Sequence, residues 1–246
     1  MIYITGDTHG NFARIDTFCR RMETQKSDTM VVLGDAGFNY YRSVKDDGAK
    51  KFASKFPITL LCIHGNHEIR PQNIPTYKET TYHGGKVLYE EEYPDILFAV
   101  DGEVYDLDDF KCIVIGGAYS VDKYYRLDRG FGWWPDEQPS DEIKSVVEAK
   151  LTALDDKIDI VLSHTCPLRY EPTEVFLEFI PQDTVDKSTE EWLGKIEEQL
   201  EYRKWYCGHY HTRKKIDKLQ FMFEDFDVLS ARKGPILANK NPPVWG

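Results

Sequence analysis

The sequence predicts an α/β fold in which two mixed β-sheets form a sandwich and helices cover its outer faces, giving four layers in the order αββα. Two observations lead to this prediction. Short apolar runs, typical of buried strands, alternate with amphipathic stretches, typical of helices, along most of the 246 residues. Between residues 86 and 115, several short runs follow one another without a helix, which indicates a second set of strands.

The individual elements follow from the same patterns. Amphipathic spacing predicts four helices, at residues 12–23, 46–56, 139–154 and 188–202. In the last of these, Ser188 and Glu191 have the spacing of a capping box, so we expect Ser188 to be the N-cap. Six apolar runs are the predicted buried strands, at residues 2–4, 30–33, 58–63, 112–115, 160–162 and 205–207.

The second set of strands is expected to be largely antiparallel. Short runs lie at residues 87–88, 96–98 and 103–105, and the dipeptide Asp101-Gly102 before the last of them predicts a hairpin turn. Residues 218–228 resemble a further strand pair.

The composition is that of one globular domain spanning residues 1–246. Hydrophobic residues make up 41% of the chain, and no run approaches the roughly 20 apolar residues that cross a membrane, so we expect no membrane partner. The first predicted strand begins so early that no signal peptide fits before it. Five widely spaced cysteines are typical of reduced core thiols, and both features favour a cytoplasmic location.

A formal net charge of −11 makes polymeric nucleic acid an unexpected partner, because long-range repulsion opposes its approach. This charge does not exclude a small phosphorylated substrate, since bound metal ions reverse the local potential. The sequence contains no signature of an oligomeric state.

Five of the predicted strands end at side chains that bind metals. In an open α/β sheet, the residues beyond the carboxyl ends of the strands form the site, so these groups are expected at one edge. Carboxylates mixed with imidazoles suit a pair of divalent first-row metal ions. The five blocks are Asp7-Thr8-His9, Gly34-Asp35, Gly65-Asn66-His67-Glu68, His164 and Gly208-His209-Tyr210-His211.

With these blocks, in this order, residues 2–212 resemble the calcineurin-like metallophosphoesterases. The resemblance implies two divalent ions, of manganese, iron or zinc. A hydroxide between the ions would attack phosphorus, and the catalytic residues would be Asp35 and His67, the latter assisting the leaving group. The implied ligands are Asp7, His9 and His211 for one ion, Asn66, His164 and His209 for the other, and Asp35 as the bridge between them.

The resemblance implies a phosphoester hydrolase and favours phosphomonoesters, because the first and third blocks resemble those of the phosphatase branch. The residues after Asp35 are Ala36-Gly37-Phe38 rather than the Arg-Gly of that branch, which argues against a phosphoprotein substrate. Three alternatives remain: a phosphodiesterase acting on small nucleotide-like substrates, a non-catalytic metal-binding scaffold, and a nuclease, which the charge disfavours.

Residues 119–139 show little periodicity but many aromatic side chains, so we expect an ordered loop over the metal ligands. The candidates for substrate contact in this loop are Arg126, Arg129 and Trp134, since arginine grips phosphate and tryptophan offers a stacking face. Alternatively, the loop packs on itself, with its arginines paired to its own aspartates. Arg42 is a weaker candidate. Glu68 either orients His67 or forms a salt bridge, while His64 and His83 are expected to be structural or to lie behind the ligands.

Overall fold

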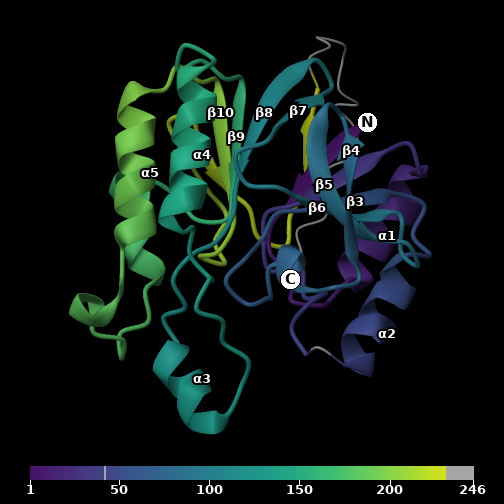
Figure 1. Cartoon of the computed structure of the whole chain (residues 1–246), viewed down its shortest axis with the longest axis horizontal. Helices are drawn as coiled ribbons and strands as arrows, with labels where there is room; N and C mark the ends of the chain where they lie inside the picture. Colours follow the sequence, from purple (N-terminus) through teal and green to yellow (C-terminus); the bar gives the residue numbers. More distant parts are fainter. Residues whose placement is uncertain (42, 231–246) are drawn as a thin grey trace.

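A computed structural model describes residues 1–41 and 43–230 and consists of two β-sheets between two layers of helices (Figure 1). The predicted α/β class, with mixed sheets and helices on the outer faces, is confirmed. Arg42 lies outside the described residues, and the proposal of one domain over residues 1–246 extends beyond them. None of the described helices has the length and apolar character needed to cross a membrane.

The first sheet has seven strands. Its four central strands run parallel, and antiparallel strands flank them on both sides. Helices α1 (Ala13–Met22) and α2 (Val44–Ala53) lie against its outer face (Figure 1). In spatial order the strands are β13 (Asp227–Leu229), β1 (Ile2–Thr5), β2 (Thr29–Val32), β3 (Thr59–Cys62), β6 (Ile96–Ala99), β5 (Gly85–Glu90) and β4 (Tyr77–Tyr82).

The second sheet has six strands, and helices α4 (Asp141–Thr152) and α5 (Ser188–Gln199) cover its outer face (Figure 1). Helix α3 (Lys123–Arg129) projects from the end of the sandwich. The strands are β11 (Lys214–Ile216), β12 (Leu219–Phe221), β10 (Lys204–Cys207), β9 (Ile160–Ser163), β8 (Phe110–Ile115) and β7 (Val104–Leu107). Single 3₁₀ turns lie at Pro71–Asn73, Leu168–Tyr170, Thr173–Val175 and Gln182–Thr184.

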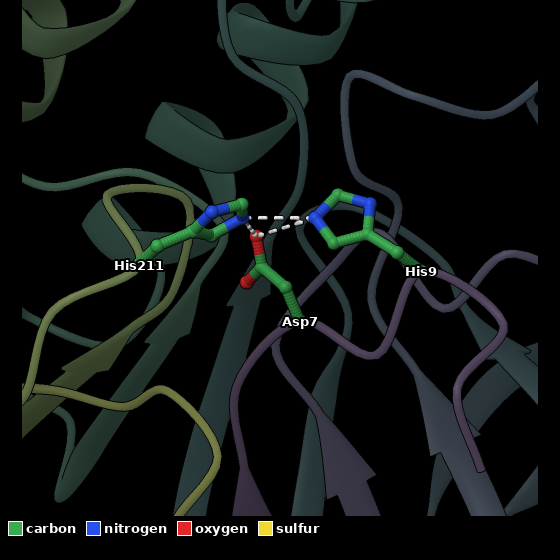
Figure 2. Close-up of side chains that lie close together, drawn as sticks. All are labelled: Asp7, His9 and His211. Carbon is green, nitrogen blue, oxygen red and sulfur yellow. Dashed lines mark hydrogen bonds and ion pairs between the residues drawn. The ribbon is translucent and has the colours of Figure 1, made fainter. Parts of the chain in front are cut away.

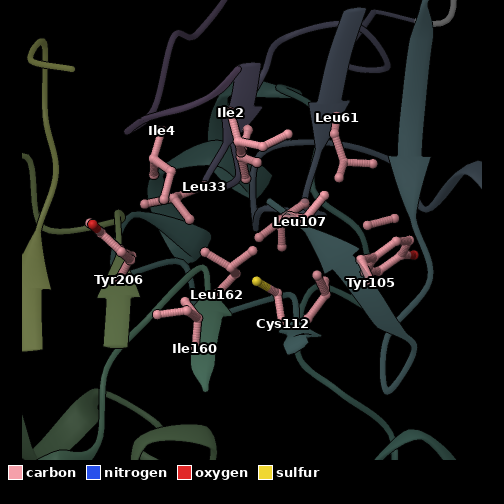
Figure 3. Packing of buried hydrophobic residues seen from close by; sticks show 14 of the residues in the cluster. Ile2, Ile4, Leu33, Leu61, Tyr105, Leu107, Cys112, Ile160, Leu162 and Tyr206 are labelled. Carbon is pink, nitrogen blue, oxygen red and sulfur yellow. The ribbon is translucent and has the colours of Figure 1, made fainter. Parts of the chain in front are cut away.

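The central strands of both sheets are apolar on both faces because each face is covered. In β1, Ile2 and Ile4 belong to the core between the two sheets, whereas Tyr3 belongs to the core beneath α1. Figure 3 shows the central core, where Ile2 and Ile4 from one sheet lie opposite Ile160 and Leu162 from the other. All five cysteines are buried and unpaired.

Two tyrosine hydroxyl groups join the sheets. Tyr105 in β7 is fully buried, and its hydroxyl donates to the Lys86 carbonyl at 2.5 Å and accepts from the Val100 N–H at 2.9 Å. Tyr206 in β10 donates to Asp227 in β13 at 2.8 Å. Each bond connects one sheet to the other, so the two hydroxyls oppose relative sliding of the layers.

The predicted hairpin at Asp101-Gly102 is wrong, because this turn carries the chain from β6 in the first sheet to β7 in the second. The Asp101 carboxylate accepts hydrogen bonds from Gly116 N–H and from buried Arg70. These distant partners, rather than strand pairing, hold the turn. Residues 86–115 are therefore divided between the sheets, and the second sheet also contains parallel pairs, from β8 through β9 and β10 to β12.

Three smaller predictions also need correction. The strands predicted within residues 218–228 do not pair with each other, since β12 joins the second sheet and β13 the first. The segment 119–139 is not free of secondary structure, because it contains α3. Ser188 is the first residue of α5 rather than its N-cap, and its N–H donates a hydrogen bond to the Asp186 carboxylate at 2.9 Å.

Replacing Tyr105 by phenylalanine should lower the free energy of unfolding by about 2 kcal/mol, because two backbone groups lose a shared buried partner. Urea unfolding followed by circular dichroism measures the change. The matched control is Tyr124→Phe, whose ring is 67% exposed on α3. Equal stability of the two variants would contradict the role assigned to the Tyr105 hydroxyl.

Candidate metal centre

The carboxyl ends of five strands bring the predicted ligands together between the sheets. Asp7 and His9 follow β1, Asp35 follows β2, and Asn66 and His67 follow β3. The second sheet adds one histidine after β9 and two after β10, which are His164, His209 and His211. Parallel strands from both sheets thus end at the same place, as the sequence predicted.

The first group consists of Asp7, His9 and His211, whose ligand atoms lie close enough to hold one ion. Figure 2 shows the Asp7 carboxylate beneath the two imidazoles. Nε2 of His9 and Nε2 of His211 are 2.8 Å apart, and Asp7 Oδ2 lies 3.3 Å from the latter and 3.8 Å from the former. Apart from these two imidazoles, this buried oxygen has no hydrogen-bond partner among the described residues.

The second group consists of Asn66, His164 and His209. Nδ1 of His164 is 2.8 Å from the Leu33 carbonyl, which only accepts, so Nδ1 carries a proton; in the neutral form of the ring, Nε2 then presents a lone pair. That nitrogen faces Asn66 Oδ1 at 2.8 Å, and His209 Nδ1 faces the same oxygen at 3.1 Å. A cation would satisfy these facing lone pairs, so the donor set fits a metal ion.

Asp35 lies between the two groups. Its Oδ2 is 3.9 Å from Nδ1 of His9 in the first group and 3.8 Å from Nε2 of His164 in the second. Its other oxygen accepts the His67 backbone N–H at 2.8 Å. One carboxylate oxygen therefore faces both groups while the other is anchored to the backbone.

The backbone around these side chains is strained. Four of the seven predicted ligands have left-handed conformations, which non-glycine residues seldom adopt. Such conformations persist where the surrounding structure enforces them, and they concentrate at functional sites. The φ angles are +47° at His9, +48° at Asp35, +67° at His209 and +49° at His211.

Two glycines make room for the carboxylates. A Cβ atom on Gly65 would lie 2.0 Å from Asp35 Oδ1, and one on Gly208 would lie 2.2 Å from Asp7 Oδ1. These contacts are far below the van der Waals limit, so each glycine is required by the aspartate that lies against it. The glycines of these blocks therefore serve the packing of the ligands.

Charge interactions within the cluster favour anionic aspartates beside histidines. Burial opposes ionisation of Asp7, but the contact with His211 and the surrounding imidazoles hold its pKa below its usual value. Burial and the neighbouring His164 lower the pKa of His209 to about 3, so this ring is neutral and able to bind a metal. The Asp7 contact raises the pKa of His211.

His67 lies beside the cluster and is held by Arg126. Nη2 of Arg126 is 2.6 Å from Nδ1 and 2.9 Å from Nε2 of the imidazole. Arg126 is buried, and it also donates to Asp122 at 2.8 Å and to the Gly132 carbonyl at 3.0 Å. Of the three predicted substrate-contact residues, Arg126 is thus brought to the cluster.

The other two, Arg129 and Trp134, lie outside it. The Arg129 guanidinium is exposed and 3.8 Å from Asp128, and Trp134 packs on the Tyr40 ring. Neither residue lines the cavity of about 390 Å³ that opens beside the metal-ligand cluster. Arg129 therefore fits the alternative in which the loop packs on itself. Arg126 fits it in part, because it pairs with Asp122 of the same loop.

Three further candidates have structural positions. Glu68 is fully buried and accepts the Gly65 N–H at 3.0 Å, so it braces its own loop. Among the described residues it neither bonds the His67 ring nor forms a salt bridge. Burial, reinforced by Asp35, raises the pKa of Glu68 to about 8. His64 is buried behind the cluster, and His83 occupies a turn between β4 and β5.

Sequence reasoning missed a chain of hydrogen bonds behind Asn66. The Asn66 amide donates to Ser120 Oγ at 2.9 Å, which turns its oxygen toward the two histidines. Ser120 N–H in turn donates to buried Glu137 at 3.2 Å. No local motif marks Ser120, because its role depends on a loop returning over β3 from the second sheet.

A cavity of about 390 Å³ opens beside the cluster. His9, Asp35, Asn66, His67, His209 and His211 line one end, and residues 171–190 form much of the other. Sequence reasoning also missed this second wall; the apolar residues after Pro172 were the available signal.

The model of the calcineurin-like phosphoesterase family matches residues 1–213. The chain belongs to this family and is a metal-dependent phosphoester hydrolase, as the clustered aspartates and histidines also indicate. No curated protein matches the chain.

Several solved structures are similar to this chain. The protein TT1561 of Thermus thermophilus shares 12% identity at a TM-score of 0.46, covering 91% of this chain and 89% of that one. The phosphopantetheinyl hydrolase of Mycobacterium tuberculosis shares 14% identity at a TM-score of 0.49, covering 90% and 87%. AQ665 of Aquifex aeolicus, a protein of unknown function, shares 12% identity at a TM-score of 0.35, covering 70% and 81%.

Replacing Ser120 by alanine should weaken metal binding by about 10- to 100-fold, because the Asn66 amide loses the partner that orients its oxygen. Calorimetric titration of metal-free protein with Mn²⁺ measures the change. Ser54→Ala at the end of α2, whose hydroxyl bonds the Lys51 carbonyl, is the control. Unchanged affinity in the Ser120 variant would show that this bond does not position Asn66.

Glu190, in the cavity wall, should make stability depend on pH. Burial and the nearby Glu171 raise its pKa from 4.5 to about 7, although the Thr165 hydroxyl donates to it at 2.7 Å. Between these pH values the unfolded chain loses a proton that the folded chain keeps, so the free energy of unfolding falls as pH rises.

The variant Glu190→Gln lacks this titration. Relative to the wild type, it should gain on the order of 3 kcal/mol of stability between pH 4.5 and 7. Urea unfolding across this range measures the difference, with exposed Glu198→Gln on the same helix as the control. A difference that does not change with pH would contradict the assignment.

Proposed function

We propose that this protein hydrolyses phosphomonoesters with two divalent metal ions, of manganese, iron or zinc. The observation that supports the proposal most is the clustering of aspartates and histidines from five strand ends. Within it, Asn66 Oδ1 faces His164 and His209, and Asp35 Oδ2 lies 3.9 Å from His9 and 3.8 Å from His164. Asp7, His9 and His211 would hold one ion, Asn66, His164 and His209 would hold the other, and Asp35 would contribute to both sites. When bound, such a pair supplies Lewis acidity toward phosphoryl oxygens and makes water more acidic.

The residues of the chain then orient the substrate. Arg126, whose Nη2 lies against the His67 ring, directs positive charge toward the phosphoryl group. His67 is held in place by its backbone bond to Asp35 and donates a proton to the leaving-group oxygen. Burial lowers the pKa of His67, and the neighbouring Asp35 opposes this shift. Arg129 and Trp134 contact only the parts of a substrate that extend beyond the cavity.

Phosphomonoesters are favoured because the Gly6–Gly10 and Gly65–Glu68 blocks resemble those of phosphatases. A phosphodiesterase acting on small nucleotide-like substrates is the second candidate. The cavity supports it, since Tyr119 and Phe176 offer aromatic surface beside the cluster. The five buried, unpaired cysteines support a cytoplasmic location.

Hydrolysis of p-nitrophenyl phosphate and of bis(p-nitrophenyl) phosphate by the Mn²⁺-loaded protein tests the proposal. We expect the monoester to have the larger kcat/KM. A larger value for the diester would select the second candidate. Failure to cleave either compound, or any of a broad phosphoester panel, would leave the proposed function without support.

Replacing His67 by alanine should reduce kcat by roughly 10²- to 10⁴-fold, because the leaving-group oxygen loses its proton donor. Bound metal and thermal stability should remain close to those of the wild type, since His67 is not a proposed ligand. Steady-state kinetics with elemental analysis measures both quantities, and His83→Ala is the control. A His67→Ala variant with normal kcat would contradict this role. If the wild type and the variant are both inactive but bind metal normally, a non-catalytic metal-binding scaffold is favoured.

A further inference from the structure

The cavity beside the metal centre is larger than a phosphoryl group requires. Its volume of about 390 Å³ falls in the range of pockets that enclose small organic ligands. His67, the proposed proton donor to the leaving group, lies in its lining. The space on this side of the cluster is therefore the space into which the leaving group points.

The wall opposite the cluster is apolar. It is built by Val175, Phe176, Leu177, Ile180 and Val185, on the segment between β9 and α5. The Phe176 ring stacks on Tyr210, with centroids 6.1 Å apart and planes inclined by 18°. Because Tyr210 lies between the two histidines of the last block, the apolar wall is continuous with the metal ligands.

The charged groups of the cavity are acidic. Glu171, Asp186 and Glu190 lie on the far side of the cluster, and Asp122 lies near His67. No lysine or arginine is among the described residues that line the cavity. Lys187 is paired with Glu171 at 2.7 Å. Asp122 is likewise paired with Arg126, whereas Asp186 is hydrogen-bonded by the uncharged Gln138 side chain and the Ser188 N–H. A second phosphate or a carboxylate on the substrate would therefore be repelled by Asp186, with no lysine or arginine in the described cavity lining to bind it.

We propose that this cavity selects phosphomonoesters whose leaving group is apolar and carries no further negative charge. The inference rests on the proposed function and narrows its substrate class. Each methylene buried against the wall strengthens binding, whereas a terminal carboxylate meets repulsion and loses its hydration. Sugar phosphates and nucleoside polyphosphates fall outside this class.

A series of n-alkyl phosphates, from ethyl to hexyl, tests the selection with Mn²⁺-loaded protein. The leaving alcohols have nearly equal acidity, so differences in kcat/KM report on the cavity. We expect kcat/KM to rise about threefold to fourfold per added methylene until the cavity is filled. The monophosphate ester of 6-hydroxyhexanoate should react at least about tenfold more slowly than hexyl phosphate.

Phe176→Ala and Phe179→Ala form a matched pair on the same segment. Phe176 lines the cavity, whereas Phe179 is 76% exposed and does not. The Phe176 variant should lower the ratio of hexyl to ethyl phosphate kcat/KM by about fivefold or more, and the Phe179 variant should keep the ratio of the wild type. Calorimetry with hexyl- and ethylphosphonate, which are not hydrolysed, should show the same change in relative Kd.

The possible outcomes distinguish failure of this inference from failure of the proposed phosphomonoesterase function. If wild-type protein cleaves the alkyl phosphates at rates that do not depend on chain length, the proposed apolar subsite is wrong. The same conclusion follows if both phenylalanine variants keep the wild-type ratio of hexyl to ethyl phosphate kcat/KM. In either case the proposal of phosphomonoesterase activity is unaffected. If no phosphate monoester is cleaved, including p-nitrophenyl phosphate, the proposed function fails and the inference fails with it.

Discussion

The site depends on one electrostatic constraint: two buried carboxylates, a buried amide oxygen and four imidazoles crowd their oxygen and nitrogen atoms into one cluster. Nε2 of His164 and Oδ1 of Asn66 are 2.8 Å apart, and when the ring is neutral with its proton on Nδ1 the two atoms have no hydrogen to share. Such an arrangement is costly unless positive charge lies within it. Bound metal ions would supply that charge, and the rest of the fold is the framework that holds these groups together.

The framework has three parts. Parallel strands from both sheets end at one place, so residues about 200 positions apart, such as Asp7 and His211, become neighbours. Tyr105 and Tyr206 tie the two sheets, which fixes the distance between the ligands each sheet contributes. The left-handed backbone at His9, Asp35, His209 and His211 then turns the side chains inward, and stability built elsewhere compensates that strain.

The fold class and the seven candidate metal ligands could be predicted from the sequence because both depend on local patterns. A buried strand is visible as an apolar run, and each ligand block directly follows such a run. Predictions failed where distant contacts decide the outcome. The Asp101-Gly102 turn has the composition of a hairpin, but its bonds to Arg70 and Gly116 direct the chain to the other sheet. Ser120 and the wall around Phe176 were missed for the same reason.

Electron paramagnetic resonance of the protein reconstituted with Mn²⁺, combined with metal analysis, tests the central claim most directly. The proposed centre would hold two ions per chain that share Asp35, so we expect the multiline spectrum of a magnetically coupled pair. A single ion per chain at saturating Mn²⁺, or two ions with the six-line spectra of isolated sites, would contradict the dinuclear centre on which this account is built.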